Sequence, residues 1–315
     1  MPVIYPMLQF VFGIAILLVS TRYFVRWVER VSAGMRISPL VVGSTLVAIG
    51  TSLPELVVSL TAMAEHDSGL AIANVVGSNI VNICLVLPVA VLAGKLRIGT
   101  TKTQRTAWVA IIVTIGFLVL YALRPSPVMS GTLLLAVAAL VTYLEYQWGI
   151  TGRSLEDFLR FRKAKKIKYG FVDILELLGS TIGVVVGGIL AVNATELLSG
   201  ALGVTTTVLG LSLTAVATSL PELATSVFSQ EDREDKLALG NILGSNIYNL
   251  TLVAGIMLFF GSWGRLPVFD VVLLIIVMIV LLFLIRGYRG RVVPPGGSVI
   301  FLLMFAAYMF LLSKG

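Results

Sequence analysis

The chain has 315 residues, of which 57% are hydrophobic and only 12% are charged. A typical soluble domain is about 45–50% apolar and about 25% charged, so this composition excludes a soluble enzyme, a nucleic-acid-binding protein and a disordered protein. The net charge of +7 is better explained by basic loops on one side of a membrane than by a nucleic-acid surface. A single cysteine, Cys84, excludes an internal disulfide and a multi-cysteine metal site.

Apolar runs recur along the whole chain. A membrane helix needs about 20 apolar residues. Ten runs of this kind lie at 5–25, 39–64, 69–93, 106–123, 126–147, 171–193, 204–229, 236–260, 267–285 and 296–313. The connections between them are too short to hold a folded domain. The sequence therefore predicts an all-α polytopic membrane protein with ten transmembrane helices, surrounded by the lipid bilayer.

The basic residues are unevenly divided between the connections. With ten spans, the odd-numbered connections carry 20 of the 23 Lys and Arg residues. Short basic loops remain in the cytoplasm. We therefore expect a multi-pass protein of the plasma membrane with both termini extracellular and the basic loop 148–170 in the cytoplasm.

An internal repeat covers the two most polar of the apolar regions. Residues 43–82 and 210–249 align at a constant offset of 167 without a gap, and 18 of the 40 pairs are identical. Five spans in each half make the halves cross the membrane in opposite directions. We therefore predict two inverted five-helix repeats, 1–147 and 171–315, joined by the loop 148–170. Inverted repeats of secondary transporters place the substrate near the membrane midplane, between the halves.

Two carboxylates lie deep within these repeated spans. Glu55 is the 17th residue of its span and lies 9 residues before the end, and Glu222 is its counterpart in the other half. A carboxylate at this depth is costly and marks a functional site by default. Pairing with a nearby basic residue is excluded, because 37–94 and 190–232 contain neither Lys nor Arg.

A proline precedes each of these glutamates. Pro54 and Pro221 lack an N–H and clash with the carbonyl four residues earlier. The second and seventh helices should therefore be broken just before Glu55 and Glu222. We expect this break to free backbone carbonyls in the preceding turn, including those near Ala48 and Ala215, as ion ligands.

Polar side chains four residues apart share one face of each repeated helix. The stripes are Thr51, Glu55 and Ser59; Asn74, Ser78 and Asn82; Thr218, Glu222 and Ser226; and Asn241, Ser245 and Asn249. All offer oxygen ligands, which suit Ca²⁺ with its 6–8 oxygens better than zinc or copper. The charge of the two carboxylates is neutralised by one Ca²⁺, two Na⁺ or two protons, so charge alone does not rank Na⁺ above H⁺. Asn79 and Asn246, off this face, are predicted to join helices by hydrogen bonds.

The motifs G-T-S-L-P-E and A-T-S-L-P-E, each followed by G-S-N-I-x-N, resemble both repeat motifs of the sodium/calcium exchanger family, within the cation/Ca²⁺ antiporter superfamily, of prokaryotic or archaeal type. The resemblance implies a secondary transporter rather than an enzyme. It implies exchange of about three Na⁺ for one Ca²⁺ by alternating access, which moves net charge in each cycle. In the family, the first and sixth helices slide against the core to switch access.

The same resemblance carries over a set of ion ligands. Glu55 and Glu222 would be central Ca²⁺ ligands shared with Na⁺. The other ligands would be Thr51, Ser52, Thr218, Ser219, Ser78, Asn82, Ser245, Asn249, Ala48 and Ala215. The transported Ca²⁺ and Na⁺ are substrates, so no cofactor, catalytic residue or nucleic-acid partner is expected, and the chain is expected to work as a monomer.

Two alternatives concern the coupling ion. Asn249 stands where K⁺-dependent relatives have Asp, which favours independence from K⁺. An H⁺/Ca²⁺ exchanger is the alternative to Na⁺ coupling.

Two other classes of membrane protein fit the sequence less well. A cation channel fits less well because channels usually use rings of like subunits, and a membrane-embedded enzyme fits less well because no nucleophile–base pair is evident.

Overall fold

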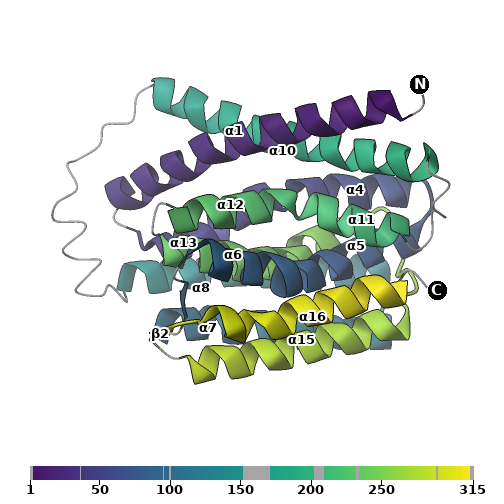
Figure 1. Cartoon of the computed structure of the whole chain (residues 1–315). Coiled ribbons are helices and arrows are strands. Elements are labelled where there is room, and N and C mark those ends of the chain that lie inside the picture. The colour runs from purple at the N-terminus through teal and green to yellow at the C-terminus, as the bar shows by residue number, and fades with distance from the viewer. Residues whose placement is uncertain are drawn as a thin grey trace.

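A computed structural model describes residues 3–35, 37–94, 96–98, 101–151, 171–201, 209–231, 234–288 and 290–312, and these are nearly all helical. Two long helices, α1 (Ile4–Met35) and α10 (Phe171–Ala201), lie along one side of a bundle, and α15 (Val268–Gly287) and α16 (Pro295–Leu312) line the opposite side (Figure 1). The start of α1 and the end of α16 lie at the same end of the bundle (Figure 1).

The predicted spans are helical where the structure describes them. Among the described residues, eight helical stretches are long and apolar enough to cross a membrane. The prediction of an all-helical, multi-pass membrane protein is therefore confirmed at this level. The seventh predicted span is represented by α11 (Leu209–Thr218) and α12 (Leu220–Glu231), and the tenth by α16.

The central spans are built from several helical segments each. The second comprises α2 (Pro39–Val42), η1 (Gly43–Val47), α3 (Ala48–Thr51) and α4 (Leu53–Ala64). The third comprises α5 (Ser68–Val81), η2 (Asn82–Val86) and α6 (Leu87–Ala93). The eighth comprises α13 (Asp235–Tyr248), η3 (Asn249–Val253) and α14 (Ala254–Met257). The fourth and fifth are α7 (Thr101–Leu123) and α8 (Pro127–Thr151).

Three of these segments, η1, η2 and η3, are wide π-helical turns that the sequence pattern did not predict. Such turns insert an extra residue into an α-helix and often occur at functional sites. η2 and η3 begin at Asn82 and Asn249, which are counterparts at the offset of 167. The two halves therefore share this local change of helical register at the same polar residue.

Two further features lie in the connections. Strands β1 (Arg97–Ile98) and β2 (Arg291–Val292) form a short antiparallel pair with Arg97 opposite Val292. This pair was not predicted, because two-residue strands carry no sequence pattern of their own. α8 continues to Thr151, and the rest of the predicted loop 148–170 lies outside the described residues.

The surface and the interior of the bundle differ in character. Large apolar side chains are exposed on the outer faces of the helices, including Ile112 (64%), Phe283 (69%) and Leu303 (65%). Apolar exposure of this extent is typical of a surface in contact with lipid. Polar residues of α4, α5, α12 and α13 are instead buried at the centre of the molecule.

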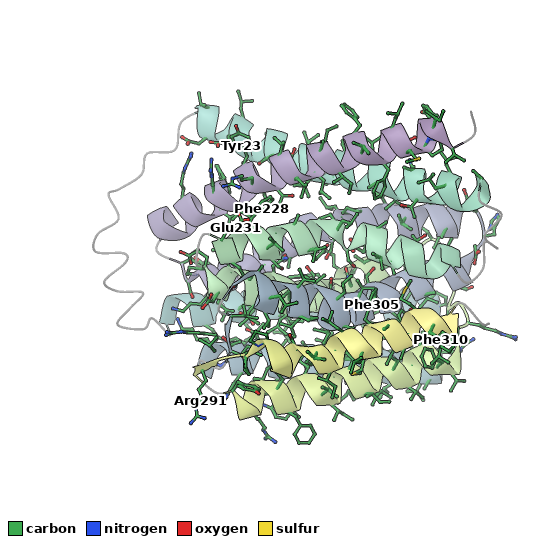
Figure 2. The ribbon with its side chains drawn as sticks, in the orientation of Figure 1. Tyr23, Phe228, Glu231, Arg291, Phe305 and Phe310 are labelled. Atoms are coloured by element: carbon green, nitrogen blue, oxygen red, sulfur yellow. The ribbon has the colours of Figure 1, made fainter. Side chains whose placement is uncertain are left out.

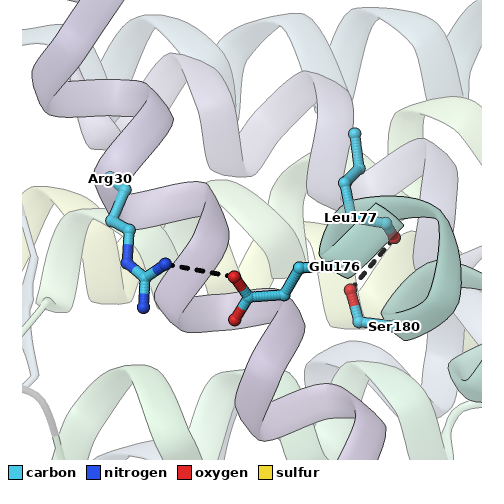
Figure 3. A network of polar contacts seen from close by, with 4 residues as sticks. All are labelled: Arg30, Glu176, Leu177 and Ser180. Carbon is cyan, nitrogen blue, oxygen red and sulfur yellow. Dashed lines mark hydrogen bonds and ion pairs between the residues drawn. The ribbon is translucent and has the colours of Figure 1, made fainter. Parts of the chain in front are cut away.

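The helices α1 and α10 pack closely against each other. A Cβ atom added at Gly187 would lie 2.6 Å from the backbone nitrogen of Leu17, so the two backbones are nearly in contact. Arg30 Nη1 of α1 lies 3.1 Å from Glu176 Oε2 of α10 (Figure 3). At the middle of α10, Gly188 faces the core, where a Cβ atom would lie 3.0 Å from Cγ of Pro54 and 3.5 Å from Cγ of Pro221.

Candidate cation site

The predicted helix breaks are present and are one residue long. α3 ends at Thr51 and α4 begins at Leu53, and Ser52 between them has φ −81° and ψ 4°. In the other half, α11 ends at Thr218 and α12 begins at Leu220. The sequence folds this way because proline cannot donate an N–H and crowds the preceding turn.

The carbonyls of the preceding turn are less free than expected. The Ala48 carbonyl accepts the N–H of Ser52 at 3.0 Å, and the Ala215 carbonyl accepts the N–H of Ser219 at 3.2 Å. The expectation of released carbonyls at these two alanines is therefore corrected. Pro54 removes the donor to the carbonyl four residues earlier, at Gly50, and not the donor to Ala48. Each carbonyl also has a hydroxyl beside it, because Thr51 Oγ1 lies 3.4 Å from the Ala48 oxygen and Thr218 Oγ1 lies 3.2 Å from the Ala215 oxygen.

The two glutamates are fully enclosed. Glu55 and Glu222 are both 0% exposed. Within the described part of the chain, none of their four carboxylate oxygens has a hydrogen-bond partner. The two carboxylates are close enough to repel each other, and the hydroxyls of Thr218 and Thr51 lie near Glu55 and Glu222, respectively. Two buried and unpaired carboxylates leave a strong negative potential that only a cation or protons can neutralise.

Hydrogen bonds join the helix break of each half to a helix of the other half. The Thr51 hydroxyl donates to Asn241 Oδ1 of α13 at 3.1 Å and lies 3.3 Å from the Ser245 hydroxyl. The Thr218 hydroxyl lies 3.1 Å from the Ser78 hydroxyl of α5. The site is therefore built from both halves, and four of the predicted residues meet in two equivalent contacts.

Asn74 and Asn241 position the glutamates but were not included among the predicted ligands. The Asn74 amide donates to the backbone carbonyl of Glu55 at 3.2 Å and to the Ser59 hydroxyl at 3.1 Å. Asn241 donates to the backbone carbonyl of Glu222 at 3.3 Å. The polar stripes include both residues, four positions before Ser78 and Ser245, but the spacing does not show that their amides bind the glutamate backbone.

The other predicted side chains are buried and available as ligands. Among the described residues, the hydroxyls of Ser52 and Ser219 and the amide groups of Asn82 and Asn249 have no hydrogen-bond partner. All four are at most 2% exposed. They add neutral oxygen atoms to a centre in which only the two glutamates are formally charged.

Contacts between the halves close the site from the sides. The Asn246 amide donates to the backbone carbonyl of Asn79 at 3.3 Å and so joins two helices as predicted, whereas the Asn79 amide donates within its own helix, to the Val75 carbonyl at 2.8 Å. A Cβ atom on Gly77 would lie 3.0 Å from Cβ of Ala215, and one on Gly244 would lie 2.7 Å from Cβ of Ala48. The absence of a side chain at both glycines lets α5 and α13 pack closely against the segments that carry Ala215 and Ala48.

Comparison with known proteins covers nearly the whole chain. The family described as "Sodium/calcium exchanger protein" matches residues 5–151 and 173–314. Sodium/calcium exchanger MaX1 of Methanosarcina acetivorans is 28% identical over 340 residues, covering 95% of this chain and 96% of that protein. Inner membrane protein YrbG of Escherichia coli is 29% identical over 281 residues, covering 85% and 86%. A solved structure of the sodium-calcium exchanger NCX_Mj has a TM-score of 0.81 and 26% identity, covering 98% of this chain and 99% of that one.

Proposed function

Since this chain belongs to the sodium/calcium exchanger family, we propose that it is a secondary antiporter that exchanges Na⁺ for Ca²⁺ across the membrane by alternating access. The observation that carries the proposal is the pair Glu55 and Glu222, fully buried and without a hydrogen-bond partner for either carboxylate among the described residues. Their combined charge is neutralised by one Ca²⁺ or by two Na⁺, so the same oxygens serve both ions in turn.

The proposed ligands are the two glutamates and the neutral oxygens around them. Ca²⁺ takes 6–8 oxygen ligands in flexible geometry. The neutral oxygens belong to Thr51, Ser52, Ser78, Asn82, Thr218, Ser219, Ser245 and Asn249, with the carbonyls of Ala48 and Ala215 binding flanking Na⁺. The hydroxyls of Thr51 and Thr218, which lie 3.4 and 3.2 Å from these carbonyl oxygens, would turn away from them when Na⁺ binds.

Coupling follows from the cost of an empty site. Without an ion, the two carboxylates remain buried as like charges, which is strongly unfavourable. The site therefore changes sides when it is filled, which makes the movement of one ion depend on the return of the other. Exchange of about three Na⁺ for one Ca²⁺ moves one net charge per cycle, worth about 2.3 kcal/mol per 100 mV.

Paired contacts at the offset of 167 support two inverted five-helix repeats. The contact of Thr51 with Ser245 has its equivalent in the contact of Thr218 with Ser78. Asn79 and Asn246 are counterparts of each other and are in direct contact. We assign the repeats to 1–147 and 171–315, with both termini outside the plasma membrane and the loop 148–170 in the cytoplasm. α1 and α10 would be the sliding pair, and one chain would suffice for function because the site lies within it.

Transport by purified protein in liposomes tests this proposal. Vesicles loaded with Na⁺ should take up ⁴⁵Ca²⁺ on dilution into Na⁺-free medium, and an inside-positive potential should speed the uptake. Separate H⁺ and K⁺ gradients identify the coupling ion. Uptake that does not depend on Na⁺ contradicts Na⁺ coupling, and uptake driven by H⁺ instead supports the H⁺/Ca²⁺ exchanger. A requirement for K⁺ contradicts the expectation drawn from Asn249.

Substitution of the carboxylates tests the site itself. Glu55→Gln and Glu222→Gln each remove one charge while keeping the shape of the side chain. Each variant should insert and purify normally but lose Ca²⁺ exchange, because a single carboxylate leaves the divalent ion unneutralised. Normal exchange by either variant would remove the basis of the assignment.

A further inference from the structure

The polar face of α12 extends beyond the cation site to the end of the helix. Thr225 and Ser229 follow Glu222 by three and seven residues and are 0% exposed. Gln230 follows by eight residues and is 4% exposed. Spacings of three, four, seven and eight residues lie on one helix face. A buried polar stripe thus leads from Glu222 to the last turn of α12, which ends at Glu231.

The two hydroxyls of this stripe lack protein partners. Over the described residues, the hydroxyls of Thr225 and Ser229 form no hydrogen bond, whereas the Gln230 amide lies beside the Asp235 carboxylate. Elsewhere in the bundle, Thr114 and Thr251 donate to the carbonyl four residues earlier, at 2.8 and 2.7 Å. Buried polar groups in proteins are paired with protein atoms or with water. Water or a passing cation is therefore the natural partner of the stripe.

The same helix face in the other half is apolar. The counterparts of Thr225, Ser229 and Gln230 at the offset of 167 are Val58, Ala62 and Met63. Helix α4 therefore has the corresponding place in the fold without these polar groups. The polarity of the α12 stripe is consequently not a requirement of helix packing.

The surfaces of α4 and α12 next to α10 and α1, respectively, also differ. On the α4 side, a cavity of about 100 Å³ lies between α4 and α10 and is lined by residues that include Thr61, Ala62 and Ile189. The counterparts of Ile189 and Thr61 on the α12 side are Arg22 and Phe228. A large basic residue and an aromatic ring thus take the places of two smaller residues.

Arg22 of α1 covers the corresponding surface of α12. Its guanidinium carbon lies 5.5 Å from the centre of the Phe228 ring, and Nη1 lies 3.5 Å from Glu231 Oε2. Phe228 and Glu231 lie at the end of α12 that α1 crosses (Figure 2). Because the charge of Arg22 is paired with that of Glu231, Arg22 would obstruct the mouth of the stripe by the bulk of its side chain and not by a net positive charge.

We propose that Thr225, Ser229 and Gln230 line a hydrated cation path between Glu222 and the end of α12, and that Arg22 closes this path. The ligands are hydrated Na⁺ and Ca²⁺, held by hydroxyl and amide oxygens. The identity of these ions and the cytoplasmic location of this end rest on the proposed function. The hydration of the stripe does not, because it rests on the buried hydroxyls of Thr225 and Ser229, which have no partner among the described residues.

Cysteine accessibility tests the path. Ser229→Cys is placed in a Cys84→Ser background, which removes the one native cysteine, and is exposed to a membrane-impermeant cationic methanethiosulfonate reagent from each side in turn. We expect reaction from the cytoplasmic side only. Arg22→Ile, which introduces the residue found at the counterpart position, should raise the rate about tenfold by opening the mouth.

A matched control separates gating from general disturbance of α1. Arg30 lies in α1, like Arg22, and forms an ion pair with Glu176 of α10. Arg30→Ala breaks this ion pair and should leave the labelling rate unchanged. Equal rates with and without Arg22→Ile, or reaction of Ser229→Cys from the outer side alone or from neither side, would overturn the proposal.

The outcome is distinguishable from that of the transport assay because labelling needs no transported ion. If Ser229→Cys is labelled as expected but Ca²⁺ uptake does not depend on Na⁺, the path is supported and the proposed Na⁺/Ca²⁺ exchange is contradicted. Normal exchange with an unreactive Ser229→Cys removes the path alone. Thr225→Val, the counterpart residue, should slow exchange severalfold while leaving equilibrium Ca²⁺ binding at Glu222 unchanged, and a wild-type exchange rate would count against the path.

Discussion

Alanine at Gly244 should separate two helices that form the cation site. A Cβ atom at this position of α13 would lie 2.6 Å from both Cα and the carbonyl oxygen of Ser44, and 2.7 Å from Cβ of Ala48. Its counterpart Gly77 is less crowded, because the nearest atom to its Cβ would be Cβ of Ala215 at 3.0 Å. The two glycines are therefore a matched pair with different clearance.

The size of the effect follows from these distances. Ordinary contact begins at 3.4 Å, so Gly244→Ala requires a backbone movement of about 0.8 Å, against about 0.4 Å for a side chain at Gly77→Ala. Overpacking of a close-packed interior costs about 1–3 kcal/mol. The movement also lengthens the 3.3 Å contact between Thr51 and Ser245. If the full cost appears in binding, Ca²⁺ affinity falls by about 5- to 150-fold.

Equilibrium ⁴⁵Ca²⁺ binding to the two purified variants measures this effect, and thermal unfolding in detergent checks the fold. We expect a clear loss of affinity in Gly244→Ala and a smaller loss, at the low end of this range or below it, in Gly77→Ala. Equal affinities in both variants and the native protein would refute the claim that backbone contact at Gly244 sets the geometry of the site.

Two further substitutions test residues around the site. Asn74→Leu leaves the Glu55 carbonyl and the Ser59 hydroxyl without their donor. It should lower Ca²⁺ affinity by about tenfold, since an unsatisfied buried group costs about 1–3 kcal/mol. Unchanged affinity in the same binding assay would contradict the positioning role of Asn74. Glu145, 2% exposed, accepts hydrogen bonds from the hydroxyls of Thr106 and Ser44 at 2.8 and 3.3 Å. Glu145→Leu should therefore lower the unfolding temperature more than Glu145→Gln, which keeps an acceptor oxygen, and equal unfolding temperatures would contradict this.

Local chemistry accounts for what could be predicted from the sequence. The break at Ser52 follows from the missing N–H of Pro54, an effect that acts within one turn and needs no tertiary information. The burial of Glu55 and Glu222 follows from long apolar spans without a basic residue. The equivalence of the halves follows from a gapless offset between the repeats.

The remaining features depend on contacts between distant segments. Thr51 meets Asn241 and Ser245 only because a helix of one half lies against a helix of the other, and a single stripe does not specify its partner. The π-helical turn at Asn82 leaves the residue order unchanged, so a pattern of spacings cannot reveal it. The Ala48 carbonyl was misjudged because the effect of proline was extended to the whole turn rather than to one acceptor.

Contact of α10 with both helix breaks bears on how tightly exchange is coupled. Gly188 faces Pro54 and Pro221 at once, so a shift of α10 along the core would change its packing at the two prolines in the same step. A carrier whose two breaks rearranged independently would at times be open to both sides and would let its ion gradients run down without work. The rate of uncoupled ion leak would then depend on how closely Gly188 packs against the two prolines, although Gly188 binds no ion, and not on the affinity of the ion ligands.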